Sequence, residues 1–308
     1  MMWLIAFQMI YVLPSTVLYI LTIYVILKKW KTAKSSFFQF YLFSFAMNMF
    51  TLLNTYYVLR LPTNTDKNGF LSPFYENIDS YFPSDFFNCM KFHLAYVQYA
   101  TVPIISLNRL AVIVSIGGYE RTWRRFSWII MLGIYFLPFI KTSDMFEKPS
   151  KWILDTSING YRLSSDNLAA RTAVYSVLTV FMVISISLSL TFNMVSFLFI
   201  KNTNVANKVL MEANLFKMTA ITCVVQMFGT AFSLGQLYID EKTILFTITL
   251  QLLPFISDCL SLIHPWLLVL MSKSISNDIR KLFKKQAITR SGTVSDTAKL
   301  NNNQVRMK

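Results

Sequence analysis

Charged residues are scarce in this chain, and their scarcity excludes a soluble protein of this length. Only 14% of the 308 residues are Asp, Glu, Lys or Arg, whereas 54% are hydrophobic. The three cysteines and two histidines show no metal-ligand spacing, and there is no HExxH motif. No lysine lies between Lys242 and Lys273 to hold a retinal, and the seventh apolar run has no second aspartate for an intramembrane protease. We therefore expect no enzyme activity, no metal and no cofactor.

Long apolar runs are what the chain has instead. A helix of ~20 apolar residues spans ~30 Å of hydrocarbon, and seven such runs follow one another, at residues 3–27, 37–59, 86–116, 126–146, 173–200, 215–239 and 243–271. The first run is too long for a cleavable signal peptide and no basic residue precedes it, so we expect it to remain as an anchor. The chain is predicted to be an all-α membrane protein, a bundle of seven transmembrane helices.

The net charge of +14 is unevenly distributed between the segments that join these runs. If the N-terminus lies outside, the inner segments hold 19 basic and 4 acidic residues, whereas the outer segments, Arg60 included, hold 9 basic and 10 acidic residues. This asymmetry follows the positive-inside rule. It predicts an external N-terminus and a cytoplasmic C-terminus, and it accounts for the positive charge without a nucleic-acid partner.

The chain divides into three predicted parts. Residues 1–271 form the seven-helix transmembrane domain, residues 272–286 an amphipathic juxtamembrane helix, and residues 287–308 a polar tail that we expect to be disordered. In the second part, apolar residues recur at helical spacing among basic ones, which predicts a helix lying on the anionic inner leaflet of the lipid bilayer. Between the second and third runs, residues 60–85 have the composition of an outer loop.

The third run ends in an arginine, Arg109, and is followed by a hydrophilic stretch that includes Tyr119, Glu120 and Trp123. An unpaired charge at the bilayer centre costs roughly 2.5–3.5 kcal/mol, so Arg109 must lie near the interface or face other helices and water. Two interpretations stay open. Arg109 is either a snorkelling side chain beside a basic loop, or part of the place where the bundle meets a cytosolic partner.

Polar residues also gather in the outer half of the third run, namely Lys91, His93, Gln98 and Tyr99. Lys91, Leu94 or Ala95, and Gln98 share one helical face by their spacing. One interpretation is an interfacial lysine with hydrogen bonds inside the bundle. The other is the polar side of a ligand cavity that opens to the outside.

Asp258 lies near the middle of the seventh run. A carboxyl group there is either protonated and bonded to a neighbouring helix, or part of a functional site. If it is functional, Asp258 is a candidate ligand-binding residue. An alternative is that it serves a multi-pass transporter of a small solute, which would predict several intramembrane charges and internal repeats, and we find no repeat.

Several stretches, taken in order, resemble one known family. They are IYVLPSTVLYILTIYVILKKWK, KSSFFQFYLFSFAMNMFTLLNTYYVLRLP, YFPSDFFNCMKFHLAYVQYA and LLPFISDCLSLIHPWLLVLMS, together with NR…YERTW. They look like the nematode serpentine receptors of class gamma, which are predicted seven-helix chemoreceptors. The resemblance implies a sensory-cell plasma-membrane protein. Its implied partners are a small odorant-like or pheromone-like ligand and a heterotrimeric G protein.

A looser similarity to the rhodopsin-like receptors implies roles for single residues. Those receptors end their third helix in Asp-Arg-Tyr, where this chain has Asn108, Arg109 and a leucine. Because an asparagine cannot titrate, the similarity implies an Arg109 that is free to meet a G protein. The residues expected to take part in coupling are Asn108, Arg109, Tyr119, Glu120 and Trp123.

The same similarity bears on the cysteines and on one proline. Cys89 lies where rhodopsin-like receptors form a disulfide to the second outer loop, but residues 141–168 contain no cysteine, so we expect no such bridge. Cys223 and Cys259 fall inside apolar runs and are expected to be packed thiols. Pro265 stands where those receptors have the proline of their Asn-Pro-x-x-Tyr motif, and it is a candidate hinge.

Overall fold

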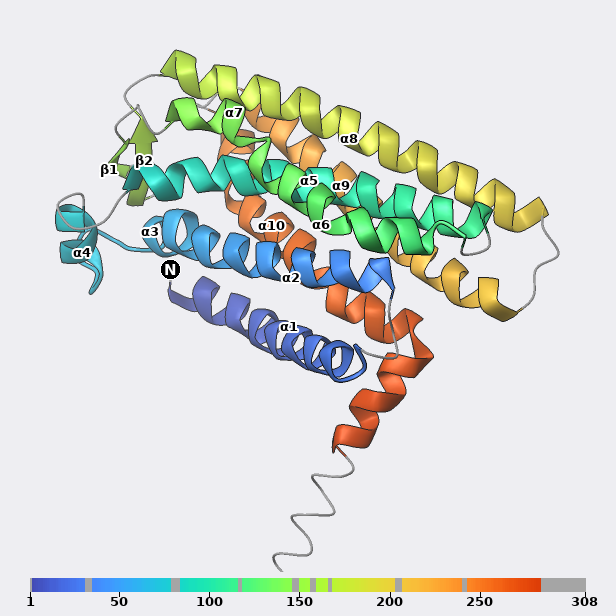
Figure 1. The fold of residues 1–308 in the computed structure, drawn as a ribbon. Helices are drawn as coiled ribbons and strands as arrows, with labels where there is room; N and C mark the ends of the chain where they lie inside the picture. The colour runs from blue at the N-terminus through green and yellow to red at the C-terminus, as the bar shows by residue number, and fades with distance from the viewer. Residues whose placement is uncertain are drawn as a thin grey trace, which may run out of the picture.

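The computed structural model describes residues 2–30, 35–78, 84–115, 118–145, 150–155, 159–165, 168–202, 207–239 and 243–283. Seven helices are long and apolar enough to cross a membrane, and they lie side by side in one bundle (Figure 1). The seven spans contain, one each, the helices α1 (Met2–Lys28), α2 (Ser36–Thr55), α5 (Ser84–Val114), α6 (Glu120–Phe136), α8 (Leu168–Asn202), α9 (Asn207–Tyr238) and α10 (Ile244–Met271). The predicted seven-helix bundle is confirmed.

Two spans extend beyond their predicted ends. Helix α2 continues through a π-helical turn, η1 (Tyr56–Arg60), and a short helix, α3 (Leu61–Thr63). Arg60 therefore belongs to the second span, and its assignment to the outer loop was wrong. Helix α6 begins at Glu120, inside the stretch that its hydrophilic residues marked as a loop, and it ends just before Pro138. The fourth span then continues as α7 (Phe139–Thr142) and the 3₁₀ turn η3 (Ser143–Met145).

One end of the bundle carries a small folded unit where the composition indicated loops. It consists of helix α4 (Ser72–Asn77) and the antiparallel strands β1 (Ser150–Asp155) and β2 (Gly160–Ser165). Gly160 starts β2 so close to the bundle that a Cβ atom there would lie 2.5 Å from the carbonyl oxygen of Thr63. We call α4 with β1 and β2 the hairpin cap, and this end of the bundle the cap end.

Aromatic side chains hold the hairpin cap together. Tyr75, Trp152 and Tyr161 are buried in one cluster, with ring centroids 5.1 Å apart for Tyr75 and Trp152 and 5.6 Å apart for Tyr75 and Tyr161. The Trp152 indole donates to Ser84 Oγ at 3.0 Å, at the start of α5. The cap is thus fixed to the third span by packing and hydrogen bonds, while all three cysteines of the chain are free thiols.

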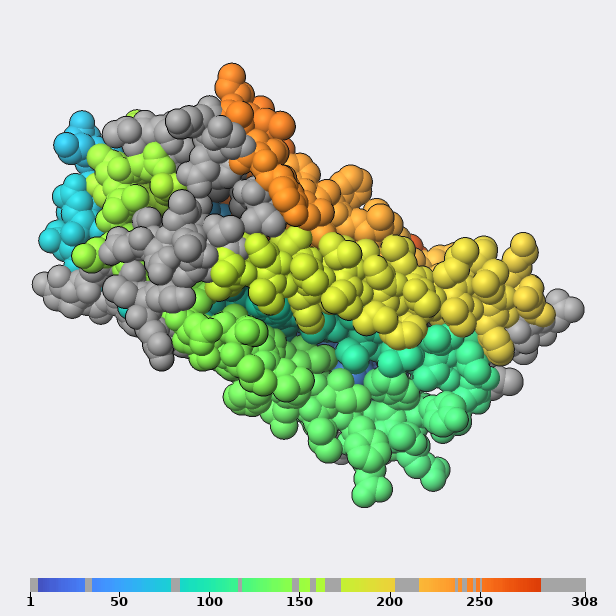
Figure 2. Space-filling model, turned by 90° about the horizontal axis from the view of Figure 1, so that it is seen from above, coloured from blue at the N-terminus to red at the C-terminus, as the bar shows by residue number. Residues whose placement is uncertain are grey.

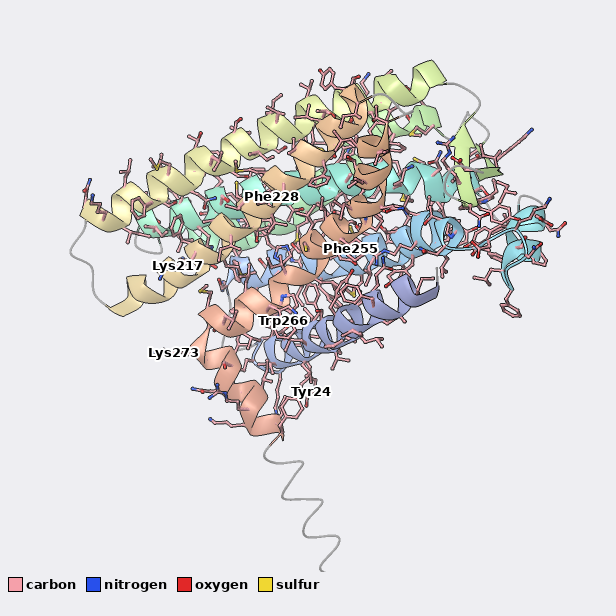
Figure 3. The ribbon with its side chains drawn as sticks, turned by 180° about the vertical axis from the view of Figure 1, so that it is seen from behind. Tyr24, Lys217, Phe228, Phe255, Trp266 and Lys273 are labelled. Atoms are coloured by element: carbon pink, nitrogen blue, oxygen red, sulfur yellow. The ribbon has the colours of Figure 1, made fainter. Side chains whose placement is uncertain are left out.

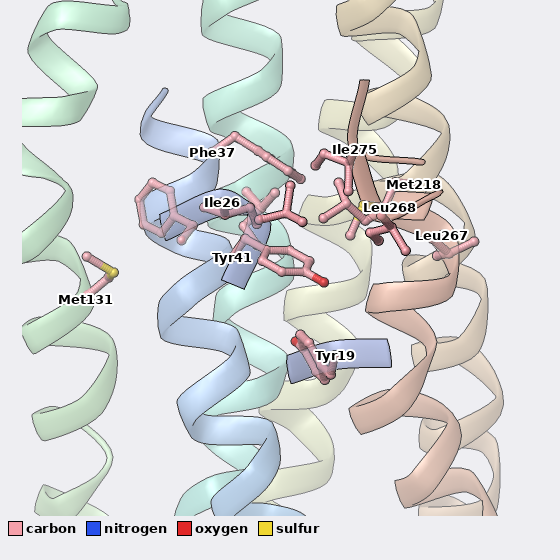
Figure 4. Close-up of a cluster of buried hydrophobic side chains, with 13 residues drawn as sticks. Tyr19, Ile26, Phe37, Tyr41, Met131, Met218, Leu267, Leu268 and Ile275 are labelled. Carbon is pink, nitrogen blue, oxygen red and sulfur yellow. The ribbon is translucent and has the colours of Figure 1, made fainter. Parts of the chain in front are cut away.

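The opposite end, which we call the basic end, contains a cluster of buried apolar side chains (Figure 4). Residues 273–283 form a further helix after α10. Its Ile275 and Ile279 are buried in this cluster, and Asp278 pairs with Lys29 at the end of α1. The sequence predicted that the apolar face of this helix lies on the inner leaflet. In the structure the described part of this face packs mainly on the bundle, and its exposed large apolar residue is Phe283. The predicted tail, residues 287–308, lies outside the described residues.

The outer surface of the bundle is apolar, as a lipid-facing surface requires. Helix α8 runs along the outside of the molecule (Figure 2), and Phe228 on α9 and Trp266 on α10 are exposed at 61% and 46%. Lys217 and Lys273 lie toward the basic end, whereas Phe228 and Phe255 lie between the two ends (Figure 3). Helix α1 starts at the cap end and the chain leaves α10 at the basic end (Figure 1), so the two termini of the bundle lie at opposite ends.

Candidate functional site

A cavity of about 120 Å³ lies among α2, α5, α8, α9 and α10. It is in the cap-end half, because the residues that line it come from the end of α2 and the start of α5, α8 and α10. Much of its wall is apolar and includes Phe92, Leu178, Met182 and Leu260. An apolar cavity of about 150 Å³ holds a benzene molecule, so this space can accept a small organic ligand.

The structure brings three of the five candidate ligand-binding residues to this cavity. Lys91, Gln98 and Tyr99 line it, together with Leu94 and Ala95 from the same face of α5. His93 does not, because two residues along a helix turn a side chain to the opposite side. It is fully buried instead, with its ring 3.8 Å from that of Phe139 and Nδ1 3.2 Å from Thr142 Oγ1.

A close contact between α5 and α9 forms one wall of the cavity. The Tyr99 hydroxyl donates to the carbonyl oxygen of Gln226 at 3.2 Å and accepts from Thr230 Oγ1 at 3.3 Å. Gly229 makes this approach possible, since a Cβ atom there would lie 2.6 Å from the Tyr99 oxygen. Nothing local in the sequence identifies Tyr99 as the partner of Gly229.

Asp258, the fifth candidate, does not line this cavity and forms a buried ion pair with Arg60. Arg60 and Asp258 are 1% and 2% exposed. The Tyr11 hydroxyl donates to Asp258 Oδ2 at 2.5 Å, and Arg60 Nη2 donates to the carbonyl oxygen of Pro254 at 2.7 Å. The pair therefore joins α1, η1 and α10, and the sequence did not supply Arg60 as the partner of Asp258.

Moving Arg60 into the membrane sharpens the charge asymmetry. The outer segments then hold 8 basic and 10 acidic residues against the unchanged 19 and 4 of the inner segments. Arg60 and Asp258 neutralise each other inside the bundle. The orientation given by the positive-inside rule stays a prediction.

Polar side chains continue from the cavity toward the middle of the bundle. Gln98 Nε2 donates to Asn48 Oδ1 at 2.8 Å and to Ser261 Oγ at 3.0 Å, and Gln226 Nε2 donates to the Gln98 carbonyl at 3.2 Å. Beside them is a polar space of about 20 Å³, which is large enough for one water molecule. A smaller space of about 10 Å³, lined in part by Phe37, follows toward the basic end.

At the basic end, Arg109 is 1% exposed and held by its neighbour in the chain. Its Nε and Nη2 atoms donate to Asn108 Oδ1 at 3.1 and 2.5 Å, and its guanidinium carbon lies 4.9 Å from the centroid of the Phe37 ring. The expectation of an Arg109 that is free to meet a partner was therefore wrong. Snorkelling to water does not describe this buried side chain either.

Ser36, at the start of α2, joins Arg109 and Asn108 to the start of α6. Asn108 Nδ2 donates to Ser36 Oγ at 2.9 Å, and Ser36 donates to Glu120 through its backbone nitrogen and through Oγ, the latter at 2.9 Å. We call Ser36, Asn108, Arg109 and Glu120 the Ser36 network. It connects three helices, and the sequence did not identify Ser36 as its centre.

The other candidate coupling residues have different surroundings. Tyr119 is 57% exposed, whereas Trp123 is partly buried with its ring edge on Phe40, 6.2 Å between centroids. Pro265 lies inside α10, which continues through it to Met271, and its role as a hinge stays a prediction.

The remaining polar and sulfur-bearing groups provide no second site. Cys89 and Cys223 are buried, but Cys259 is exposed on the outer surface, so its assignment as a packed thiol was wrong. Within the part of the chain that the structure describes, no three His, Cys, Asp or Glu side chains lie close enough to hold a metal ion.

Two comparisons with known proteins agree with this arrangement. Residues 5–279 match the family model of the Srg family chemoreceptors. The chain is also 29% identical over 296 residues to serpentine receptor class gamma-31 of Caenorhabditis elegans, an alignment that covers 91% of this chain and 92% of that protein.

Proposed function

Because the chain belongs to the Srg family of chemoreceptors, we propose that it is a chemosensory receptor that binds a small external ligand and signals to a heterotrimeric G protein. It is a multi-pass membrane protein, and the chain enters and leaves the helix bundle at opposite ends. The ligand binds in the cavity of the cap-end half, and the G protein binds at the basic end.

The observation that carries the proposal is that one helix, α5, serves both ends. Gln98 and Tyr99 line the cavity, and Asn108 and Arg109 belong to the Ser36 network. These positions are separated by about 15 Å of helix at 1.5 Å per residue. A ligand that changes how α5 packs on α9 changes the contacts of Asn108 and Arg109 with α2 and α6.

The network favours one arrangement of the basic end as long as it is intact. A ligand must bind the active arrangement with ~5 kcal/mol greater affinity to convert a mostly inactive population to a mostly active one. Breaking the contacts between α2, α5 and α6 exposes polar groups that a cytosolic protein can bind. Tyr119 and Arg121 are exposed beside the network in the resting arrangement.

No observation favours the transporter alternative. Its candidate residue, Asp258, is bound to Arg60 and Tyr11 and does not line the cavity. The family relationship is to receptors, and it supports neither transport nor an enzyme activity.

The proposal is tested by ligand-evoked signalling in transfected cells. Cells that express the chain are exposed to a panel of small volatile and water-soluble odorants while calcium and cAMP are recorded. We expect Arg109→Ala to reduce the evoked response at least about tenfold at equal surface expression, because it removes a charged group that the opened network offers to the G protein, and a hydrogen bond to a charged group is worth ~1.5–3 kcal/mol. Arg162→Ala, in the hairpin cap, is the matched control and keeps the response. An unchanged response in Arg109→Ala would contradict the assigned role.

A further inference from the structure

Several polar groups that line the cavity already have partners within the protein. Thr51 Oγ1 donates to the carbonyl oxygen of Met47 at 2.9 Å, and Ser233 Oγ donates to that of Gly229 at 3.0 Å. Gln98 and Tyr99 are bonded as described above. These groups add little selectivity for a ligand, because their hydrogen bonds are made whether or not the cavity is filled.

Asn54 differs from these groups. It lines the cavity, its side chain is 2% exposed, and its Oδ1 atom has no hydrogen-bond partner. Buried polar side chains normally have a partner, and a buried amide without one costs free energy. An unpaired carboxamide on the wall of a ligand-sized cavity is a binding group that the folded chain leaves unused.

We infer that the cavity takes a small, neutral and largely apolar molecule whose single hydroxyl group donates a hydrogen bond to Asn54 Oδ1. This inference rests on the proposed function and specifies its ligand. The size follows from the volume of about 120 Å³. Since a cavity of about 150 Å³ holds benzene, a ligand of about the size of benzene is the upper limit here.

The neutral class follows from the surroundings of the unpaired group. The unpaired Asn54 Oδ1 atom is a hydrogen-bond acceptor, which suits a ligand hydroxyl group that donates to it. The groups next to Asn54 and on the facing helix are the hydroxyls of Thr55 and Ser257, which are also neutral. Lys91 is the cation among the described residues of the wall, and its ammonium lies 4.6 Å from the centroid of the Phe92 ring. An ionised ligand would leave water for a mostly apolar space, which is costly without a charge partner at Asn54.

The test is photoaffinity labelling of the full chain in lipid nanodiscs, because it reports the position of the probe rather than its partition into lipid. The probe is 3-azibutanol, a diazirine alcohol of about seven non-hydrogen atoms, and the comparison probe is the same diazirine without the hydroxyl group. Labelled peptides are mapped by mass spectrometry, and 1-hexanol and hexanoate serve as competitors. We expect the alcohol to label peptides of α5 and α9 that line the cavity, about tenfold more than the comparison probe, as the loss of one hydrogen bond predicts.

The variant Asn54→Leu keeps the branched shape and the number of non-hydrogen atoms of the side chain and removes its hydrogen-bonding groups. We expect it to lower cavity labelling by the alcohol about tenfold and to leave labelling by the comparison probe unchanged. Asn77→Leu, the same substitution on the exposed helix α4, is the control and keeps the labelling. A monodisperse elution profile in detergent shows that each variant is folded.

Two results would overturn the inference. One is equal labelling by the two probes in the parent chain and in Asn54→Leu. The other is hexanoate competing better than 1-hexanol, with the advantage lost in Lys91→Met. The proposed function can fail separately. If labelling of the cavity depends on Asn54 but the chain evokes no signal in cells, the proposal of a signalling receptor is contradicted and the inferred class of ligand still holds.

Discussion

In the cap-end half of the bundle, a cavity of about 120 Å³ is lined by Asn54, which has an unpaired polar atom, whereas in the basic-end half the side chains of the Ser36 network bond to one another. Asn54 Oδ1 and the Nε and Nη1 atoms of Arg60 have no hydrogen-bond partner in the first half. In the second half Ser36, Asn108 and Glu120 satisfy each other, and the internal space beside Phe37 is only about 10 Å³. The difference indicates a half prepared to accept a ligand and a half closed by internal bonds.

The two buried arginines repeat this contrast. Arg60 is paired with a carboxylate on another helix, so its charge is compensated inside the bundle. Arg109 has a neutral amide from the adjacent residue as its acceptor and an aromatic ring at its face. The ion pair fixes α10 against η1, whereas Arg109 contacts α2 through the Phe37 ring. Four predictions probe this comparison.

The largest effect is expected from removing one partner of the buried ion pair. Arg60→Met leaves the Asp258 carboxylate without a charge partner, which costs ~3–5 kcal/mol. In a chain of this size that corresponds to a fall of roughly 5–8 °C in Tm. The measurement is the fraction that remains monodisperse in detergent after heating.

An exposed ion pair provides the control. Lys29→Met breaks the contact with Asp278. The Lys29 side chain is 45% exposed, and a surface ion pair is worth at most ~1 kcal/mol. The double variant Arg60→Met, Asp258→Leu should be more stable than Arg60→Met alone, because no buried charge is left unpaired. Equal losses in Arg60→Met and Lys29→Met would show that the buried pair does not hold the cap-end half.

The pair also marks the limit of sequence prediction for this fold. Seven spans follow directly from hydropathy, and Asp258 stands out as a charge within one of them. Arg60 does not stand out, because it lies at the end of an apolar run before Leu-Pro and is typical of a loop boundary. The π-helical turn η1 places its side chain inside the bundle, and that turn has no local signal here. The rule that intramembrane charges pair with one another could have linked Arg60 to Asp258.

The candidate site was predictable to the same extent. Helical spacing was sufficient to group Lys91, Ala95 and Gln98 on one face, and the structure places that face on the cavity. The same spacing sets His93 on the other side of α5, but it could not supply the partner of His93, Thr142 on α7, nor Ser36, which reaches Asn108 from another helix. Contacts within one helix are thus readable from the sequence, whereas contacts between helices require the packing.

The second prediction tests the tight wall of the cavity. Gly229→Ala places a Cβ atom 2.6 Å from the Tyr99 oxygen. Tyr99 must then move and lose its bonds to Gln226 and Thr230, at a cost of ~1–3 kcal/mol. We expect a lower Tm and a weaker ligand-evoked response.

Two variants sharpen this result. In a Tyr99→Phe background the added methyl group no longer meets an oxygen, so Gly229→Ala should cost almost nothing there. Gly133→Ala, where the nearest atom is 4.0 Å away, should stabilise the chain by roughly 0.5–1 kcal/mol through helix propensity. Additive losses of Tyr99→Phe and Gly229→Ala would refute the contact.

The third prediction opens the closed half. Glu120→Gln weakens the charge-assisted hydrogen bonds from Ser36, which are worth ~1–2 kcal/mol. On the proposed function this shifts the population toward the active arrangement, so basal signalling should rise roughly five- to tenfold. The measurement is cAMP or calcium without ligand at matched surface expression. Arg121→Gln, an exposed neighbour, is the comparison, and a fall in basal signalling of Glu120→Gln would contradict the closed state.

The smallest effect concerns the hairpin cap, which lies outside the spans. Burial raises the pKa of the Tyr161 hydroxyl above its ordinary value of about 10, and the hydrogen bond to Glu76 raises it further. A raised pKa in the folded state means that the neutral hydroxyl stabilises the cap fully below pH ~10 and that this contribution is lost as pH rises through the folded value. Cap opening should therefore begin only in alkaline solution. It is measured as a change in the fluorescence emission of Trp152, which is obtained by subtracting the emission of the Trp152→Phe variant from that of the parent chain. Tyr161→Phe should lower cap stability by ~1 kcal/mol at pH 7 and remove this part of the alkaline transition. An identical alkaline transition in Tyr161→Phe would assign it to other groups, and the cap would then owe its stability to aromatic packing alone.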